Sequence, residues 1–329
     1  MKKKLVVFCC ILSMLCTLTA CKDSTSAKKE IILNEVAHSV FYAPLYVALE
    51  KGYFEEQGLE VTLVTGFGAD KTMTALLSGE ADIGFMGPES TIYTYQGGME
   101  DYAVNFAQLT QRAGNFVVGR QKEDNFSFEN LKGKTVIAGR AGGMPQMIFE
   151  YVLKQHGLDP KTDVIMNQSI DFGATAAAFS GGQGEYTIEF EPHATALEEK
   201  GDGVVLGSLG EESGYVPYTS FSAKKSYLES NPEIIKQFVT GLKKGVEYVV
   251  THSPKETATV IQPQFKEMEA DTLTKIIERY QKQDTWKKDL VFSREAFDLL
   301  QAILMDAGVM EEKASYEDLV NTTFTLGGE

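Results

Sequence analysis

Short apolar runs alternate with amphipathic stretches along the first part of the chain. The apolar runs include "EIILNEV" (30–36), "EVTLV" (60–64), "ADIGFM" (81–86) and "YAVNFAQL" (102–109). Apolar residues recur at helical spacing between them, over 42–57 and 69–79. This alternation predicts βαβ units built around a mostly parallel sheet.

A second α/β set follows a change at "NFVVG" (115–119). "KTVIAG" (134–139) precedes a helix that runs to His156, with Gly157 as its stop. "DVIMNQ", "EYTIEF" and "GVVLGSL" continue the alternation to about Leu209, and the chain is mainly helical after residue 223. We expect two α/β lobes, the first completed by the C-terminal helices.

The N-terminus has the pattern of an export signal. Three lysines (2–4) precede an apolar run from Leu5 to about Leu18, which is shorter than a membrane span requires. The run ends in Leu18-Thr19-Ala20-Cys21, which resembles the lipobox of bacterial lipoproteins. We expect a signal peptide at 1–20, a lipidated Cys21 at the start of a flexible tether (21–29), and anchoring of the exported protein to the cell membrane. The alternative is a cleaved signal with Cys21 lost or idle.

Cysteine content and net charge exclude some cross-links and partners. The four cysteines are Cys9, Cys10, Cys16 and Cys21, so cleavage before Cys21 leaves one thiol and no intrachain disulfide. Removing the three signal lysines takes the net charge from −15 to −18, and so acidic a surface repels nucleic acid. We therefore expect no nucleic-acid partner.

Several loops follow the carboxyl ends of the predicted strands, where open parallel sheets bind ligands. They span residues 37–42, 65–68, 86–90, 110–115, 140–145, 167–173 and 189–193. Phe41 is equally expected in the cleft wall and in the core. Tyr42 is expected to face the cleft. Together with the segment around 216–222, these loops supply the candidate ligand-binding residues: His38, Ser39, Phe41, Tyr42, Phe67, Gly87, Pro88, Glu89, Gln111, Gly142, Gly143, Met144, Glu191 and Tyr218.

Several motifs in sequence order resemble those of substrate-binding proteins of ABC importers. They are "FYAPLYVALEKGYFEEQGLEVTLV", "TMTALLSGEADIGFMGPES", "LKGKTVIAGRAGGMPQ", "EFEP" and "ESNPEIIKQF". The nearest group binds aliphatic sulfonates, nitrate and formylated aminopyrimidine precursors of thiamine. The resemblance covers about residues 30–310 and identifies the family without identifying the ligand.

The resemblance implies a two-lobed periplasmic-binding-protein-like fold of type II, in which each lobe is a mixed, mostly parallel sheet flanked by helices. Lobe 1 would comprise 30–117 with 220–329, and lobe 2 would comprise 118–219. The hinge would lie near 117–120 and 216–222. The implied partners are a small-molecule ligand and the permease and ATPase of an importer, and a monomer is expected.

Two kinds of ligand remain open. In relatives that bind sulfonate or nitrate, the loop that contains Gly142 and Gly143 cradles the anion, and Arg140 could add charge or be solvated. Three carboxylates in the candidate loops, Glu89, Glu189 and Glu191, oppose an anion and favour an amine.

The "EFEP" loop gives the amine hypothesis a candidate residue. In pyrimidine-binding relatives, a glutamate of the corresponding loop contacts an exocyclic amine, and Glu191 matches it. The family often has tryptophan where this chain has Phe190. Strand alternation puts Glu189 and Glu191 on the same side, so which of them faces the cleft stays open.

Two other functional classes are alternatives for this chain. A fungal branch of the family makes the thiamine pyrimidine and needs a cysteine-rich iron-binding motif, whereas this chain has no cysteine beyond Cys21. The four histidines are scattered, so we expect no metal, no cofactor and no catalysis. A ligand sensor is the other alternative. The sequence favours a receptor for an ABC importer, whose ligand is an aminopyrimidine thiamine precursor or a similar amine-bearing aromatic compound.

Overall fold

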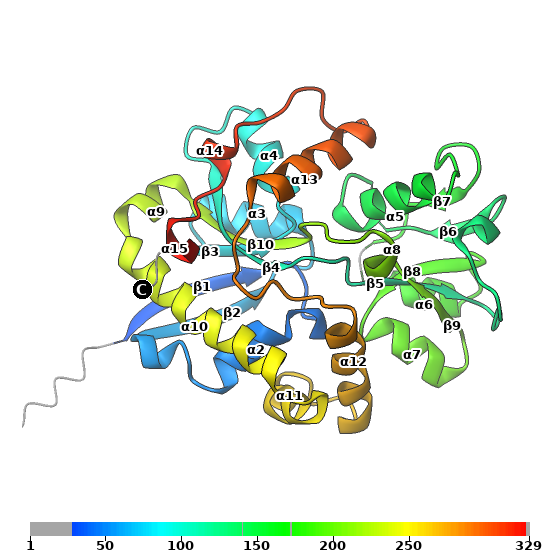
Figure 1. Ribbon diagram of the computed structural model, residues 1–329, viewed down its shortest axis with the longest axis horizontal. Coiled ribbons are helices and arrows are strands. Elements are labelled where there is room, and N and C mark those ends of the chain that lie inside the picture. The colour runs from blue at the N-terminus through cyan, green and yellow to red at the C-terminus, as the bar shows by residue number, and fades with distance from the viewer. Residues whose placement is uncertain (1–27, 140, 172, 327–329) are drawn as a thin grey trace, which may run out of the picture.

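The computed structural model describes residues 28–139, 141–171 and 173–326 (Figure 1). The predicted signal peptide, the lipidated Cys21, most of the tether and Arg140 lie outside the described residues. No helix in the described part is long and apolar enough to cross a membrane.

Two five-stranded sheets form the framework. The first has the order β2 (Leu59–Thr65), β1 (Lys29–Glu35), β3 (Ile83–Met86), β10 (Thr219–Lys224) and β4 (Ala103–Thr110). β1 is parallel to β2 and β3, and β10 is antiparallel to both β3 and β4, so four of the five strands share one direction.

The second sheet repeats this arrangement. Its order is β7 (Ile165–Asn167), β6 (Thr135–Ile137), β8 (Tyr186–Phe190), β5 (Asn115–Gly119) and β9 (Val204–Ser208). β6 is parallel to β7 and β8, whereas β5 is antiparallel to β8 and β9. The predicted fold class, two mixed and mostly parallel sheets flanked by helices, is confirmed.

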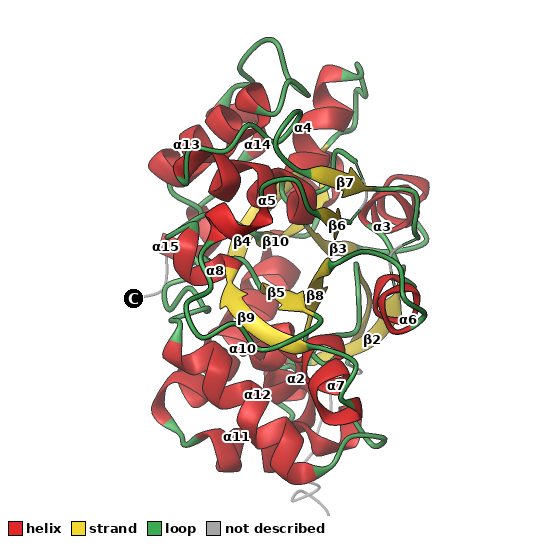
Figure 2. Ribbon diagram, turned by 90° about the vertical axis from the view of Figure 1, so that its right-hand side faces the viewer, coloured by secondary structure: helices red, strands yellow, loops and turns green. Residues whose placement is uncertain are grey.

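Helices surround both sheets, as the strands in the interior of Figure 2 show. Around the second sheet lie α5 (Met144–Gln155), α6 (Thr175–Ser180), α7 (His193–Lys200), α8 (Leu209–Glu212) and the 3₁₀ turn η3 (Phe128–Leu131). The remaining elements are η1 (Val40–Tyr42), α2 (Ala43–Glu50), η2 (Glu55–Gln57), α3 (Ala69–Ser78), α4 (Glu89–Gln96), α9 (Lys225–Ser230), α10 (Pro232–Thr251), α11 (Pro254–Ile261), η4 (Gln262–Gln264), α12 (Ala270–Lys282), α13 (Arg294–Asp306), α14 (Tyr316–Leu319) and α15 (Thr323–Leu326).

The helix expected over 42–57 is divided in the structure. α2 ends at Glu50, because Gly52 takes a left-handed backbone conformation, and the short turn η2 follows. α2 is buried along most of its length and packs against α10. A β-carbon on Gly245 would come within 2.2 Å of the Pro44 carbonyl oxygen, so the two helices meet backbone to backbone.

The chain passes between the sheets twice. It leaves β4 and enters β5 across residues 111–114, and it returns across 209–218 before β10. The predicted lobe boundaries, at 117/118 and 219/220, fall inside β5 and β10 and stay predictions. β1, β2, β3, β6 and β8 all end toward the region between the sheets, which is where the candidate site is found.

Candidate ligand-binding site

A cavity of about 420 Å³ lies between the two sheets. This volume suits a small molecule. Residues from both sheets line it: Val36, Ala37, His38, Ser39, Tyr42, Phe67, Gly68, Ala69, Asp70, Lys71, Gly87, Glu89, Gly139, Gly143, Met144, Pro145, Asp171, Gly173, Thr175, Ile188, Glu189, Phe190, Glu191, Pro192, His193, Tyr218 and Thr219.

Ten of the sequence-predicted ligand-binding residues line this cavity. They are His38, Ser39, Tyr42, Phe67, Gly87, Glu89, Gly143, Met144, Glu191 and Tyr218. The other four, Phe41, Pro88, Gln111 and Gly142, are not part of the lining.

Phe41 belongs to the core behind the cavity. It is fully buried, and its ring contacts those of Tyr42, Phe190, Tyr218 and Tyr280. The adjacent Tyr42 does reach the cavity, so the two aromatic residues of η1 divide between the core and the site.

Gln111 and Gly142 have partners within the fold. The Gln111 side-chain amide donates to the carbonyl and carboxylate oxygens of Asp284, each at 3.1 Å. The Gly142 N–H donates to Gln146 Oε1 at 2.9 Å, and its carbonyl accepts from the Tyr93 hydroxyl at 3.2 Å. The Gly142 amide is therefore already engaged at the start of α5.

His38 carries a positive charge at one side of the cavity. Its Nδ1 lies 2.8 Å from Glu35 Oε1 and its Nε2 lies 3.0 Å from the Gln264 carbonyl oxygen. Both partners only accept hydrogen bonds, so both contacts require the doubly protonated imidazolium. The hydrogen bond to Glu35 raises the pKa of His38 above its usual value, against the opposing effect of burial.

The buried Glu35 carboxylate organises this side of the site. Tyr46 donates its hydroxyl to Glu35 at 2.7 Å and Thr65 donates at 2.9 Å, in addition to the contact with His38. Next to His38, the Ser39 hydroxyl donates to the Glu191 carbonyl oxygen at 2.7 Å. This bond joins the loop after β1 to the loop after β8, so it connects elements of the two sheets.

The Glu191 carboxylate is held by protein groups. It is fully buried, forms an ion pair with Arg279 of α12, and accepts from the backbone N–H and hydroxyl of Thr195 at 2.9 and 3.0 Å. Arg279 also contacts Glu198 at 3.3 Å. Glu191 therefore touches the cavity while its charge is neutralised from behind.

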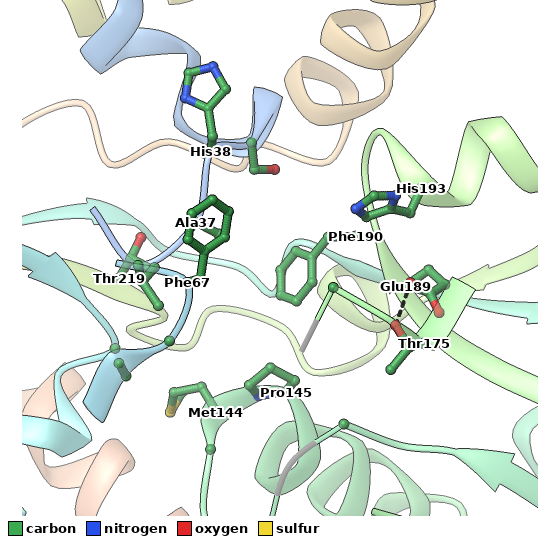
Figure 3. A pocket seen from close by; sticks show the side chains of 18 of the residues that line it. Ala37, His38, Phe67, Met144, Pro145, Thr175, Glu189, Phe190, His193 and Thr219 are labelled. Carbon is green, nitrogen blue, oxygen red and sulfur yellow. Dashed lines mark hydrogen bonds between the residues drawn. The ribbon is translucent and has the colours of Figure 1, made fainter. Parts of the chain in front are cut away.

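Glu189 is a second buried carboxylate in the lining, and its surroundings differ. Oε2 accepts from the Thr175 hydroxyl at 3.0 Å (Figure 3). Oε1 accepts from the Thr187 hydroxyl at 2.6 Å. Burial raises the pKa of Glu189 to about 7, and the two hydroxyls oppose this rise only in part. At neutral pH this group can be in either protonation state.

Aromatic and apolar side chains complete the walls. Figure 3 shows Phe67 and Phe190 reaching the cavity from different elements, with Met144 and Pro145 at its other side. Phe67 is 64% exposed and has a φ of 56°, a left-handed conformation that costs energy for a residue with a side chain. A strained, exposed aromatic residue at a cavity rim indicates a role in binding rather than in stability.

Several residues of the cavity lining lie outside the set predicted from the sequence. Thr175, Asp70 and Lys71 lie in the first turns of α6 and α3, just beyond the loops that the strand pattern indicated. Extending each predicted loop by one helical turn would have included them. Among the described residues, no three of His, Cys, Asp and Glu are arranged to hold a metal ion.

The amino-acid sequence of the chain is similar to those of a known protein family. The family described as "NMT1/THI5 like" matches residues 40–257. The Bacillus subtilis protein named "Putative binding protein YtlA" is 44% identical over 316 residues, which cover 95% of this chain and 94% of that protein. The 4-amino-5-hydroxymethyl-2-methylpyrimidine phosphate synthase of Aspergillus parasiticus is 24% identical over 68% of each chain.

Solved structures share the fold at low identity. The alkanesulfonate-binding protein SsuA from Xanthomonas axonopodis pv. citri, bound to MOPS, superposes with a TM-score of 0.71 at 17% identity, covering 90% of this chain and 98% of that one. The periplasmic nitrate-binding protein NrtA from Synechocystis gives 0.61 at 16% identity, covering 74% and 69%. Both structures have the periplasmic-binding-protein architecture that the sequence predicted.

Proposed function

Because the chain belongs to the NMT1/THI5-like family, we propose that it is an extracytoplasmic solute receptor. It captures a small molecule between its two lobes and delivers it to the permease and ATPase of an ABC importer. The observation that carries this proposal is the cavity of about 420 Å³ lined from both sheets. The 44% identity to a protein named for binding supports it further.

Three contacts near the cavity connect the two lobes, as expected if the lobes close on a ligand. The bond from Ser39 to the Glu191 carbonyl and the bond from Tyr93 to the Gly142 carbonyl each connect the two lobes. A third connection joins Lys154 of α5 to Asp306 of α13 at 2.6 Å. Closure about the two crossing segments would make or break these contacts together.

For the ligand, we propose an amine-bearing aromatic compound of the aminopyrimidine class. Phe67 and Phe190 offer flat apolar surfaces, and Glu89 and Glu189 contribute buried carboxylates to the lining. A carboxylate next to an amino group gains a charge-assisted hydrogen bond.

An anion such as a sulfonate or nitrate is the second candidate, because two of the similar structures are sulfonate- and nitrate-binding proteins. The local chemistry favours it less. The Gly142 amide is taken by Gln146, Pro145 has no N–H, and the carboxylates of the lining would repel an anion.

Catalysis has less support than binding. The synthase relatives are distant, at 24% identity or below, and this chain has no cysteine beyond residue 21. We also propose that the protein is exported, held at the membrane through a lipidated Cys21, and monomeric.

The test is thermal unfolding of residues 22–329 with panels of aminopyrimidines, aliphatic sulfonates and nitrate. A ligand at 100 times its dissociation constant stabilises the folded state by about 2.7 kcal/mol, which shifts the melting temperature measurably. Ala37→Trp, which fills the cavity, should abolish the shift, whereas Lys122→Ala on the exposed surface should keep it. If no compound shifts the wild type, and native mass spectrometry of protein purified from cells finds no bound molecule, the receptor proposal is wrong.

A further inference from the structure

Glu189 combines burial with an incomplete set of partners. Its side chain is only 2% exposed, yet it lines the cavity. Two neutral hydroxyls, those of Thr175 and Thr187, donate to it, and no basic side chain of the described chain forms an ion pair with it. Such a carboxylate costs folding free energy, so its presence at a cavity wall indicates a binding role.

The geometry leaves acceptor positions on both oxygens. An ionised carboxylate has about four acceptor positions, two on each oxygen. One hydroxyl occupies one position on Oε1 and the other occupies one on Oε2, so each oxygen keeps a position for another donor. Two parallel N–H groups, one per oxygen, are the donors that match this arrangement best.

Glu191, two residues after Glu189, has a different set of partners. Its oxygens receive Arg279 and two donors of Thr195, so its charge has a basic partner inside the protein, although burial still raises the pKa of Glu191. Of these two glutamates, Glu189 alone has no basic partner among the described residues, and a cationic ligand could supply one.

We propose that Glu189 is the specificity-determining residue of the cavity and selects a planar cation with two adjacent N–H donors, of the amidinium or aminopyridinium class. The inference rests on the proposed receptor function and names its ligand chemistry. Phe67 and Phe190 supply the apolar surfaces that a planar ring requires.

A cation that binds to Glu189 should displace a proton from its carboxyl group. The pKa of Glu189 is about 7 in the ligand-free protein, and a bound cation lowers it, so binding at pH 7 releases part of a proton. The other titratable groups that line the cavity are His38, Tyr42, Asp70, Lys71, Glu89, Asp171, Glu191, His193 and Tyr218. Among the described residues, the pKa of Glu189 is set by burial and by the hydroxyls of Thr187 and Thr175 rather than by a charged neighbour. His38, Glu191 and His193 also have shifted pKa values. The part of the proton release that belongs to Glu189 is therefore the part that disappears in Glu189→Gln.

The experiment uses benzamidine as the cationic probe, with benzamide as its neutral counterpart and benzenesulfonate as the anion. Titration calorimetry should show benzamidine binding at least tenfold more weakly to Glu189→Gln than to the wild type. Glu185→Gln is the matched control, since it makes the same change four residues earlier, at an exposed site paired with Lys134. It should bind benzamidine as the wild type does.

A second measurement needs only the wild type. Calorimetry at pH 7 in two buffers with different ionisation heats should show proton release on benzamidine binding, and at pH 9 the release should vanish. Unchanged benzamidine affinity in Glu189→Gln, equal affinity for benzamide, or binding without proton release would each overturn the assignment.

The two proposals can fail separately. If benzenesulfonate or another anion binds and benzamidine does not, the cation assignment is wrong while the receptor function stands. If nothing in either panel binds and no small molecule accompanies the purified protein, both are wrong.

Discussion

The guanidinium of Arg279 pairs with the buried carboxylate of Glu191, 88 residues earlier in the chain. Through this pair, α12 holds the loop that follows β8, which is also the loop that closes one side of the cavity. The same guanidinium contacts Glu198 and lies over the ring of Phe116 at 5.3 Å. Arg279 thus supports a binding wall from behind.

Arg279→Ala should lower the free energy of unfolding by about 3 kcal/mol, because it leaves the charge of Glu191 buried without a partner. Urea unfolding at pH 7 measures this loss. Lys275→Ala is the control: Lys275 lies 3.8 Å from Glu198 and is 58% exposed, so its loss should cost less than about 1 kcal/mol. Equal effects of the two substitutions would contradict the role given to Arg279.

Glu189→Gln should increase stability at alkaline pH. The pKa of Glu189 is raised from 4.5 to about 7, so the folded protein holds this proton more tightly than the unfolded chain does. The wild type therefore loses stability relative to the variant as pH rises from 4.5 through 7, by roughly 1.4 kcal/mol per pH unit at most. Urea unfolding at pH 4.5 and pH 8 tests this. A difference that does not change with pH would be inconsistent with a buried ionising Glu189.

His38 should make the free energy of unfolding depend on pH. Its pKa is raised above 6.5 in the folded state, so its contribution is fully present below pH 6.5 and is lost as pH rises through the folded pKa. His38→Gln should remove this slope, whereas His156, whose pKa is also raised, remains in both proteins and cancels in the comparison. Unfolding curves between pH 5.5 and 9 measure the slopes, and identical slopes would argue against the imidazolium.

Phe67→Ala should weaken ligand binding with little effect on stability. The ring is 64% exposed, so its removal costs few packing contacts, whereas a bound ring loses about 1 kcal/mol of stacking, or roughly fivefold in affinity. Calorimetry with the probe that binds the wild type checks this, and Phe67→Tyr, which keeps the ring, serves as the control. A large fall in melting temperature without ligand would instead assign Phe67 to the fold.

Gly245→Ala should destabilise the protein, although alanine normally favours a helix over glycine by about 1 kcal/mol. The new β-carbon would lie 2.2 Å from the Pro44 carbonyl oxygen and 3.0 Å from the Ala48 β-carbon, so α10 must move away from α2. We expect a loss of about 1 to 3 kcal/mol in the free energy of unfolding. Thr240→Ala, at an exposed position of the same helix, should change it by less than about 1 kcal/mol.

The sequence predicted the architecture because the pattern that specifies it is local. Alternation of apolar runs and amphipathic stretches gave the order of strands and helices, and the carboxyl ends of parallel strands indicated the loops that line the cavity. The family resemblance, carried by contiguous motifs, is confirmed by the match over residues 40–257.

The local sequence pattern does not predict how individual side chains are oriented. Phe41 and Tyr42 are adjacent aromatic residues in one 3₁₀ turn, and the packing of Tyr280 and Tyr218 around Phe41 decides which one reaches the cavity. The residue type of Phe67 likewise does not predict its left-handed backbone conformation. That conformation depends on how the loop joins β2 to α3.

Local sequence patterns are enough to predict two α/β lobes with a carboxylate-bearing segment between them. Which carboxylate is left for a ligand depends on the packing of segments that are distant in the chain. Glu189 and Glu191 share one side of the chain, and strand periodicity cannot separate them. Arg279 arrives from a distant helix and neutralises one of the two, while the other receives only hydroxyl groups. The charge of a buried group depends on neighbours brought by folding, and these are not encoded in the residues beside it.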